Sequence, residues 1–446
     1  MQTNVVLVLV HGVCVLAATA GAEDWPQFRG PGGRGIAEGA RFPDRWSASK
    51  NIAWKCEIPG RGWSSPIVSG RRVFLTTAVN LGQSEAPKKG LYLFGNRPEP
   101  PRSEHEWRVL CLDLESGRVI WERTVHRGLP RSAIHLKNSY ASETPVTDGQ
   151  RVYAYFGNVG LYALDMDGSL VWSRAFEPRR TRDGWGTAAS PALLGDRIFL
   201  VQDNEEQSRL LALHTRTGEI VWQVERDEKS NWSTPCLWVH GERTEIVTAG
   251  SGKVRSYDLD GKLLWWLRGM SGITIPTPHA SDQLLYVSSG FVMSLLRPLY
   301  AIRPGASGDI SLQGNRTTSQ HIAWCVWRAG PYNPSTLLYQ GRLYVLLDRG
   351  MLSCYDAERG TPLYERERIP QGKAFTASPW ACGGKIFCLN EDGVTFVFRA
   401  GDSCQLLHTN PLAEDDMCLT TPAASGDRLL IRSSQRLYCI RQPAAE

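Results

Sequence analysis

Aromatic side chains recur at one kind of position in this chain of 446 residues, a few residues before a repeated proline. The six aromatic residues at this position are Trp63, Tyr140, Trp185, Trp232, Tyr332 and Phe375. Charged residues lie in the same loops, namely Arg61, Lys373, Asp183, Asp415 and Asp416. If the fold gathers these loops around one axis, the aromatic faces could stack on a planar cofactor, a sugar or an aromatic side chain of a partner, with Arg61 and Lys373 at the rim. The competing interpretation is that the aromatic side chains only plug a channel.

Other arrangements that carry out catalysis or hold metals do not occur in the sequence. The nine histidines include no His-Glu-x-x-His pair, and no spacing of Ser, His and Asp indicates a nucleophile. No two cysteines have Cys-x-x-Cys spacing, which argues against a structural zinc site. Glu143, Asn231 and Asn333 lie in the same loops, but their spacing defines no metal cage. The sequence thus nominates a ligand-binding site, leaves the catalytic residues unknown and predicts no metal.

A repeated hairpin must position these loops. In residues 210–222, Leu211 and Leu213 alternate with Ala212, Thr217-Gly218 forms a turn, and a second strand ends in Trp222. Gly218 supplies the positive φ that such a turn often needs. The same pattern recurs in residues 110–121, 161–172 and 254–265, and more loosely in residues 352–360.

A second hairpin precedes each copy and begins with a hydroxyl residue followed by proline. The prolines are Pro66, Pro145, Pro191, Pro235, Pro278, Pro379 and Pro422, with Pro334 one or two places out of register. Two hairpins in a period of about 45 residues give four strands per unit, which is the blade of a β-propeller. The sequence therefore predicts an all-β chain that folds into one domain of eight four-stranded antiparallel blades.

The last unit lacks its fourth strand. A suitable strand is available in residues 51–55, just before the first unit. We expect this N-terminal strand to complete the eighth blade, which closes the ring and removes an exposed sheet edge.

Segments outside the repeat have separate interpretations. Residues 1–22 form an apolar run that ends in Ala20-Gly21-Ala22, which is typical of a secretory signal peptide, with a retained membrane anchor as the alternative. Residues 23–446 would then be the propeller. A loop insertion at about residues 79–106 interrupts the first blade, and its proline and charge content favours a solvated loop over a lid.

Composition excludes further classes. The net charge of +5 is spread along the chain without a basic run, so we expect no nucleic-acid partner. No segment after residue 22 is apolar enough to cross a bilayer. Ten cysteines follow residue 22, and Cys111, Cys354 and Cys439 occupy a repeat position where alanine occurs in other copies, which predicts buried small residues.

The repeat resembles the tryptophan-docking motif of eight-bladed quinoprotein propellers. That superfamily includes dehydrogenases that use pyrroloquinoline quinone (PQQ) and a non-enzymatic propeller lipoprotein of outer-membrane assembly. Residues 25–31, 62–68, 301–309 and 377–379 look like the exported PQQ-like repeat proteins of planctomycete-type bacteria. By this resemblance, the residues that dock each blade on its neighbour are Trp54, Trp121, Trp172, Trp222 and Trp265.

The resemblance leaves the function open, because one propeller fold serves catalysts and scaffolds alike. Dehydrogenases of the superfamily carry an adjacent cysteine pair, a Ca²⁺ ion and an Asp base, and this sequence contains no adjacent cysteines. We therefore expect a monomeric ligand- or protein-binding scaffold that is exported to the periplasm or cell envelope. The alternative is a PQQ-dependent dehydrogenase of an alcohol or sugar that binds PQQ with Ca²⁺, and a hydrolase or lyase is a third class. No cofactor is expected for the scaffold, whose partner would be an envelope protein or a small planar or sugar ligand.

Overall fold

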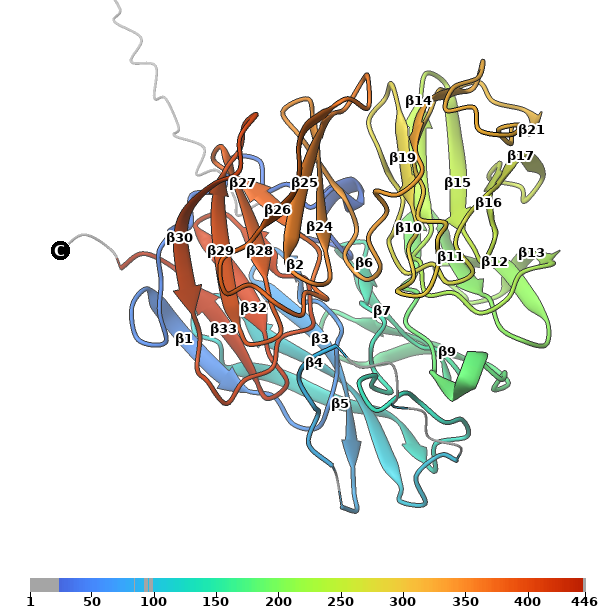
Figure 1. Ribbon diagram of the computed structural model, residues 1–446. Coiled ribbons are helices and arrows are strands. Elements are labelled where there is room, and N and C mark those ends of the chain that lie inside the picture. The colour runs from blue at the N-terminus through green and yellow to red at the C-terminus, as the bar shows by residue number, and fades with distance from the viewer. Residues whose placement is uncertain (1–23, 84, 92–94, 96–98, 444–446) are drawn as a thin grey trace, which may run out of the picture.

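The chain forms a ring of eight sheets. The computed structural model describes residues 24–83, 85–91, 95 and 99–443, so the expected signal peptide of residues 1–22 lies outside the described residues. Eight antiparallel sheets follow one another around a central axis (Figure 1). The only helices among the described residues are two short 3₁₀ turns, η1 (Pro31–Gly33) and η2 (Arg182–Gly184). The prediction of an all-β, eight-bladed propeller is confirmed.

Blades 1 to 4 follow the predicted order of strands from the axis outward. Blade 1 contains β2 (Ile67–Ser69), β3 (Arg72–Asn80), β4 (His105–Asp113) and β5 (Val119–Gly128). Blade 2 contains β6 (Val146–Thr147), β7 (Arg151–Phe156), β8 (Gly160–Asp165) and β9 (Leu170–Ala175). Blade 3 contains β10 (Ala192–Leu194), β11 (Arg197–Gln202), β12 (Ser208–His214) and β13 (Ile220–Arg226). Blade 4 contains β14 (Cys236–His240), β15 (Arg243–Ala249), β16 (Lys253–Tyr257) and β17 (Leu263–Arg268), with the short β21 (Gly308–Asp309) added in parallel at its outer edge.

Blades 5 to 8 complete the ring. Blade 5 contains β18 (His279–Ala280), β19 (Leu285–Ser288), β20 (Leu299–Ile302) and β22 (Ile322–Val326). Blade 6 contains β23 (Leu337–Tyr339), β24 (Arg342–Leu347), β25 (Met351–Asp356) and β26 (Pro362–Arg368). Blade 7 contains β27 (Trp380–Cys382), β28 (Lys385–Leu389), β29 (Val394–Arg399) and β30 (Gln405–Pro411). Blade 8 contains β31 (Ala423–Ser425), β32 (Arg428–Arg432), β33 (Arg436–Ile440) and β1 (Ile52–Glu57).

The N-terminal strand closes the ring as expected. β1 pairs antiparallel with β33, with Trp54 opposite Cys439 and Lys55 opposite Tyr438. In Figure 1 the blue β1 accordingly lies beside the red β33. The edge of β33 that the chain would otherwise leave unpaired is thereby covered.

A row of three residues across neighbouring strands explains why one position of the repeat carries a small side chain. In blade 1, Phe74, Cys111 and Trp121 lie opposite one another on three neighbouring strands. The rings of Phe74 and Trp121 approach to 5.9 Å between centroids above the small side chain of Cys111. In the same way, Ala163, Ala212 and Ala301 each lie between an aromatic residue and a tryptophan. The position therefore takes Ala or Cys because two large rings cover it.

Tryptophan and glycine join each of these blades to the next. Trp222 donates its indole N–H to the Leu259 carbonyl at 2.9 Å, and its ring covers Gly261 of the following blade. A Cβ atom at Gly261 would lie 2.9 Å from that ring. The same pairing is formed by Trp54 with Gly117, Trp121 with Gly168, Trp172 with Gly218, and Trp324 with Gly360.

Trp265 differs from the other four tryptophans that the resemblance nominated. Its indole N–H donates to the carboxylate of Glu245 in its own blade, at 2.7 Å, rather than to a turn of blade 5. The Glu245 side chain is completely buried, so its oxygens require donors from inside the blade. Trp265 still packs against Leu285 and Val287 of blade 5 within one buried cluster. Trp324, which the resemblance did not nominate, forms the corresponding contact between blades 5 and 6.

Two further findings concern the described part of the chain as a whole. Within it, no helix is long and apolar enough to cross a membrane. Its ten cysteines are free thiols, and all except Cys56 and Cys404 are buried. Burial raises the pKa of the Cys111 thiol to about 12, which keeps it protonated and unreactive at neutral pH.

Candidate ligand-binding site

A ring of hydroxyl side chains lines the axis of the propeller. Each blade contributes one Ser or Thr at the start of its innermost strand, and the backbone N–H of one donates to the hydroxyl of the next at 2.9 or 3.0 Å. Six such bonds run from Ser65 to Thr144, Thr144 to Ser190, Ser190 to Thr234, Thr277 to Ser335, Ser335 to Ser378, and Ser378 to Thr421. Among these eight described residues, the bond is not formed between Thr234 and Thr277 or between Thr421 and Ser65.

The hydroxyl ring also explains the irregular proline of blade 6. In seven blades the ring residue directly precedes the repeated proline, whereas Pro334 directly precedes Ser335. Ser335 nevertheless keeps its place in the ring, with bonds to Thr277 and Ser378. The repeated feature is therefore the hydroxyl group, and the proline only restricts the backbone beside it.

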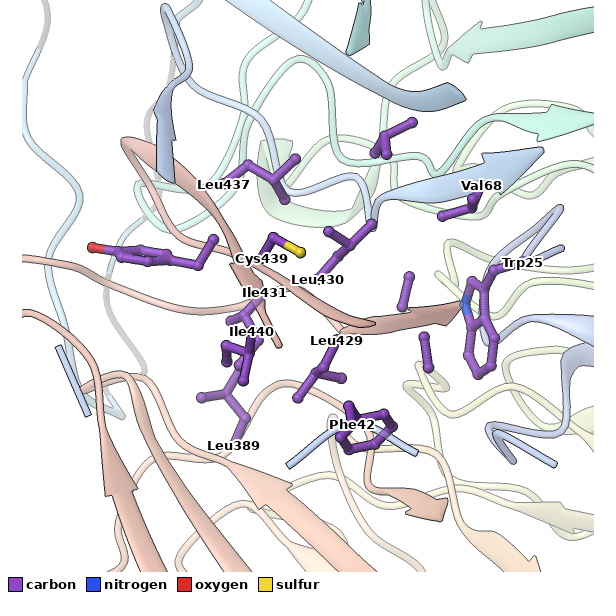
Figure 2. Close-up of a cluster of buried hydrophobic side chains, with 14 of the residues drawn as sticks. Trp25, Phe42, Val68, Leu389, Leu429, Leu430, Ile431, Leu437, Cys439 and Ile440 are labelled. Carbon is purple, nitrogen blue, oxygen red and sulfur yellow. The ribbon is translucent and has the colours of Figure 1, made fainter. Parts of the chain in front are cut away.

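An N-terminal segment closes one end of the axis. Residues 24–37, here called the strap, cross this end and pair with the innermost strands of several blades. Its backbone bonds the backbones of Val68, Thr147 and Ala381, and its Arg29 side chain donates to the Thr336 carbonyl. Figure 2 shows Trp25 of the strap beside the strand that carries Val68, where the two backbones exchange hydrogen bonds of 2.9 Å. Phe28 of the strap faces the axial cavity.

A buried arginine anchors the strap. Arg29 is completely buried and donates to the carbonyls of Thr336 at 2.7 Å and Arg34 at 3.3 Å. Burial lowers the pKa of this guanidinium to about 10. Because a buried cation is costly to leave without acceptors, these carbonyl contacts fix the position of the strap beneath the ring.

The axial cavity has a volume of about 710 Å³. The hydroxyl ring and Phe28 line its lower part, and four larger aromatic side chains line its walls, namely Trp63, Trp185, Trp232 and Tyr332. The rings of Trp185 and Trp232 are 5.6 Å apart and inclined by 35°. Trp63 and Trp232 are held by indole hydrogen bonds of 2.8 Å to the carbonyls of Lys137 and Gly186. These bonds fix the walls before any ligand arrives.

Charged groups surround the mouth of the cavity. Arg182, Asp183, Asp348 and Arg349 are among its lining residues. Asp348 is buried, and this burial raises the pKa of its carboxyl group, while Arg297 and Arg349 oppose the rise. The mouth thus offers both signs of charge around an aromatic wall.

An ion pair spans the mouth from blade 7 to the loop before blade 2. Lys137 contacts the carboxylate of Glu391, whose side chain is completely buried. Lys137 also donates to the carbonyl of Gly90 at 2.8 Å, and the N–H of Gly90 donates to Glu391 at 2.9 Å. Gly90 belongs to the insertion in blade 1, so this segment of the insertion lies at the mouth. Lys89 also donates to the carbonyl of Glu414 at 3.0 Å, and Leu91 lines the cavity while it is 42% exposed.

Four of the eight nominated residues do not line this cavity. Phe375 is completely buried against Phe396 between blades 6 and 7, because its neighbour Thr376 takes the axial side of the loop. Tyr140 is turned outward, where its hydroxyl donates to the Ser132 carbonyl at 2.8 Å.

The two nominated cations also lie away from the cavity walls. Arg61 pairs through its backbone with Ala78 and donates to the carbonyl of Glu85. Lys373 is exposed to solvent on the same face as the mouth but does not line the cavity. Neither residue is therefore assigned to the ligand site. Asp415 contacts Arg436 at 3.0 Å, and Asp416 is buried beside the same arginine at 3.1 Å.

Several lining residues were missed by sequence reasoning. The hydroxyl residues could be found in the sequence, since each one adjoins a repeated proline. Sequence reasoning used this pair of residues only to mark where a strand begins. Phe28 and Lys137 had no such signal, because their positions result from contacts between segments far apart in the chain.

One buried carboxyl group lies beside the cavity. Burial raises the pKa of Glu143 to about 7, although the hydroxyl of Thr187 donates to it at 2.6 Å. Glu143 lies between blades 2 and 3 and does not line the cavity. It therefore serves as a buried hydrogen-bonding group rather than as a wall of the site.

The donor set does not fit a Ca²⁺-bound quinone. Among the described residues, no group of three His, Cys, Asp or Glu side chains could hold a metal ion. No cysteine lines the cavity, and the carboxylate of Glu391 is already bound by Lys137, Gly90 and Thr376. Aromatic walls are present, but a cage of oxygen ligands for Ca²⁺ is not formed by the described residues.

The fold is an eight-bladed propeller with an axial cavity. Residues 105–289 match the family model described as outer membrane protein assembly factor BamB. The match spans β4 to β19, so this part of the chain is similar to that family. These comparisons do not address the planctomycete-type subgroup.

Solved structures share the fold at low sequence identity. BamB from Moraxella catarrhalis is 13% identical with a TM-score of 0.53, and the match covers 82% of this chain and 99% of that one. A quinohemoprotein alcohol dehydrogenase from Pseudomonas putida is 11% identical with a TM-score of 0.57, covering 95% and 82%. A europium-containing methanol dehydrogenase is 10% identical with a TM-score of 0.58, covering 94% and 98%. No curated protein matches the chain in sequence. Scaffolds and enzymes thus share this fold, and at these identities the likeness extends to the fold alone.

Proposed function

We propose that the protein is a binding scaffold of the cell envelope whose axial cavity holds a small ligand with a flat face. The observation that carries this proposal is the cavity of about 710 Å³, closed at one end, in which Trp185 and Tyr332 remain partly exposed. Aromatic surface left uncovered inside a fold is destabilising unless a ligand covers it. The volume falls within the range of about 300–1,000 Å³ that is usual for small-molecule sites.

The walls favour a sugar or a planar acid. Aromatic rings stack on the flat face of either ligand. The hydroxyl groups of the ring supply hydrogen-bond donors and acceptors at the closed end of the cavity. Arg182 and Arg349 supply positive charge at its mouth. Localisation in the envelope is supported by the apolar run of residues 1–22 and by the family description, which names an outer-membrane assembly factor.

A PQQ-dependent dehydrogenase is the second candidate. Its supporting observation is the position of the aromatic walls on the propeller axis, with Trp185 and Trp232 packed together. The described residues do not supply a carboxylate cage for Ca²⁺. The experiment described next distinguishes the dehydrogenase from the scaffold.

Tryptophan fluorescence titration tests the proposal. The full chain is titrated with PQQ, with and without Ca²⁺, and with cellotriose as a sugar probe. We expect saturable binding of at least one probe, Ca²⁺-independent for PQQ, which Trp185→Ala weakens about tenfold through the loss of stacking. Trp266→Ala is the control, because Trp266 is a half-buried tryptophan on the outer edge of blade 4, beside Arg268.

Three results would contradict the proposal. Binding of PQQ that requires Ca²⁺, together with alcohol-dependent reduction of a dye, would favour the dehydrogenase. Equal loss of binding in Trp185→Ala and Trp266→Ala would place the ligand outside the axial cavity. Absence of saturable binding by either probe would remove the support for this ligand class.

A further inference from the structure

The loop between β19 and β20 presents two aliphatic side chains to solvent at the mouth of the cavity. Met293 is 70% exposed and Leu295 is 86% exposed, more than any other large hydrophobic residue among the described ones. Exposed aliphatic side chains at this level require an explanation when they lie together on one tip. Phe291, Val292 and Met293 of the same loop also line the cavity.

The loop holds this conformation through its own hydrogen bonds. The N–H of Ser294 donates to the Phe291 carbonyl at 2.9 Å, and the N–H of Leu296 donates to the Ser294 hydroxyl at 3.2 Å. Phe291 packs edge-on against Tyr332, with centroids 5.6 Å apart. The exposed tip is therefore a folded turn anchored to the cavity wall.

Cations surround the tip on blades 5 and 6. Arg297 and Arg328 pair through their backbones at the base of the loop. Arg366 donates to the Arg328 carbonyl at 3.2 Å, and Arg368 donates to the Arg349 carbonyl, so these side chains lie next to one another. The basic sector comprises Arg297, Arg328, Arg349, Arg366, Arg368 and Lys373. Among the described residues, no carboxylate oxygen lies within 4.0 Å of any of these six cations, and the buried Asp348 acts on Arg297 and Arg349 from a longer distance. Glu365 and Glu367 alternate with the arginines of β26.

We infer that this face docks on an anionic lipid bilayer, with Met293 and Leu295 inserted among the headgroups and the basic sector against the lipid phosphates. A tip with two exposed aliphatic side chains beside a group of cations suits the interfacial layer of a bilayer. The adjacent cations complement a negative surface, where each one adds to the attraction. Because residues 291–293 belong to both the tip and the cavity wall, docking turns the mouth of the axial cavity towards the membrane.

Oxidation of Met293 by hydrogen peroxide measures the docking directly. The full chain is oxidised with no vesicles, with phosphatidylcholine vesicles, and with vesicles that also contain phosphatidylglycerol, and each methionine is followed by peptide mass spectrometry. We expect the anionic vesicles to slow oxidation of Met293 several-fold, and high salt to remove this protection. Met166 is the internal control, because it is partly exposed in the turn between β8 and β9, on the opposite face of the ring.

Charge variants test the basic sector. Arg328→Glu with Arg349→Glu should weaken partitioning onto anionic vesicles at least about tenfold, since two attractive charges become repulsive. The matched control is Arg118→Glu with Arg216→Glu, which makes the same change at two exposed positions in turns of the opposite face. The apolar run of residues 1–22 is identical in both variants, so it does not affect the comparison.

Either of two results overturns the inference. The first is an equal rate of Met293 oxidation with and without anionic vesicles. The second is an equal loss of partitioning in both charge variants. The second result would assign the attraction to net charge rather than to this face.

Discussion

Trp54 of β1 covers Gly117 of blade 1, and through this contact the first strand of the propeller locks the last blade to the first. Its indole N–H donates to the Leu114 carbonyl at 3.0 Å. A Cβ atom at Gly117 would lie 2.4 Å from the Trp54 ring, and the φ of Gly117 is +68°. The closure of the ring therefore depends on both the missing side chain and the unusual backbone of this glycine.

Gly117→Ala should destabilise the protein by more than the backbone strain alone. Strain at positive φ costs about 1–3 kcal/mol, and displacement of the Trp54 ring adds to it. Gly195→Ala is the matched control, because Gly195 has a φ of +56° and open space around its Cβ position. Urea unfolding curves of both variants measure the difference. Equal loss of stability would show that Trp54 does not depend on Gly117.

Removal of a buried docking tryptophan should have a larger effect. Trp121 is 6% exposed and donates to the Met166 carbonyl of blade 2 at 2.9 Å. Trp121→Ala should cost about 3–5 kcal/mol, as is usual for large buried aromatic side chains. Trp222→Ala should cost less, since Trp222 is more exposed. Thermal unfolding provides the comparison, and an unchanged midpoint for Trp121→Ala would contradict its docking role.

The ion pair at the mouth can be broken from one side. Lys137→Met leaves the completely buried carboxylate of Glu391 without its cation, which should cost about 3–5 kcal/mol. The double variant Lys137→Met, Glu391→Gln should recover part of this loss, because it removes the uncompensated charge. Chemical denaturation of the three proteins checks this order. A double variant less stable than Lys137→Met would show that the buried charge is not the cause.

The contribution of the buried Glu143 carboxyl group to the stability of the fold should decrease as the pH rises from about 4.5 to about 7. Burial raises the pKa of Glu143 from its usual value of 4.5 to about 7, so the folded state binds this proton more tightly than the unfolded state does. The contribution is fully present below pH 4.5 and is lost as the pH rises through 7. Burial also raises the pKa of Glu228 to about 7, which adds a second contribution of the same sign.

Glu143→Gln isolates the first contribution. The difference in unfolding free energy between the variant and the native chain should change by about 3 kcal/mol between pH 4.5 and pH 8, following the shift in pKa. Unfolding at several pH values measures this difference. A difference that does not vary with pH would mean that the pKa of Glu143 is not raised.

The repeat made the fold predictable because its signal is local and occurs many times. A strand with a turn glycine and a terminal tryptophan, as in Gly218 and Trp222, defines one hairpin, and the period then defines the blade. Ring closure followed from the missing strand of the last unit. Trp265 departed from this pattern because the buried Glu245 captures its indole N–H.

The site was only half predictable, since loop conformation decides which side chain faces the axis. Tyr332 and Phe375 both stand three residues before their hydroxyl residues, yet Tyr332 lines the cavity and Phe375 turns away. Phe28 reaches the site through the strap, and Lys137 is held there by Glu391, which is 254 residues distant. No local pattern in the sequence encodes such contacts.

The two gaps in the hydroxyl ring divide the propeller into two arcs of four blades. Blades 1–4 and blades 5–8 are each linked internally, whereas the junctions between Thr234 and Thr277 and between Thr421 and Ser65 lack the bond within the described residues. At one junction Ser233 donates instead to the Pro276 carbonyl at 2.9 Å, and at the other Arg432 donates to Ser64 at 2.6 Å. These junctions lie opposite each other across the axis. The hydroxyl ring is in effect two open chains of four groups, and other hydrogen bonds join the blades where these chains end.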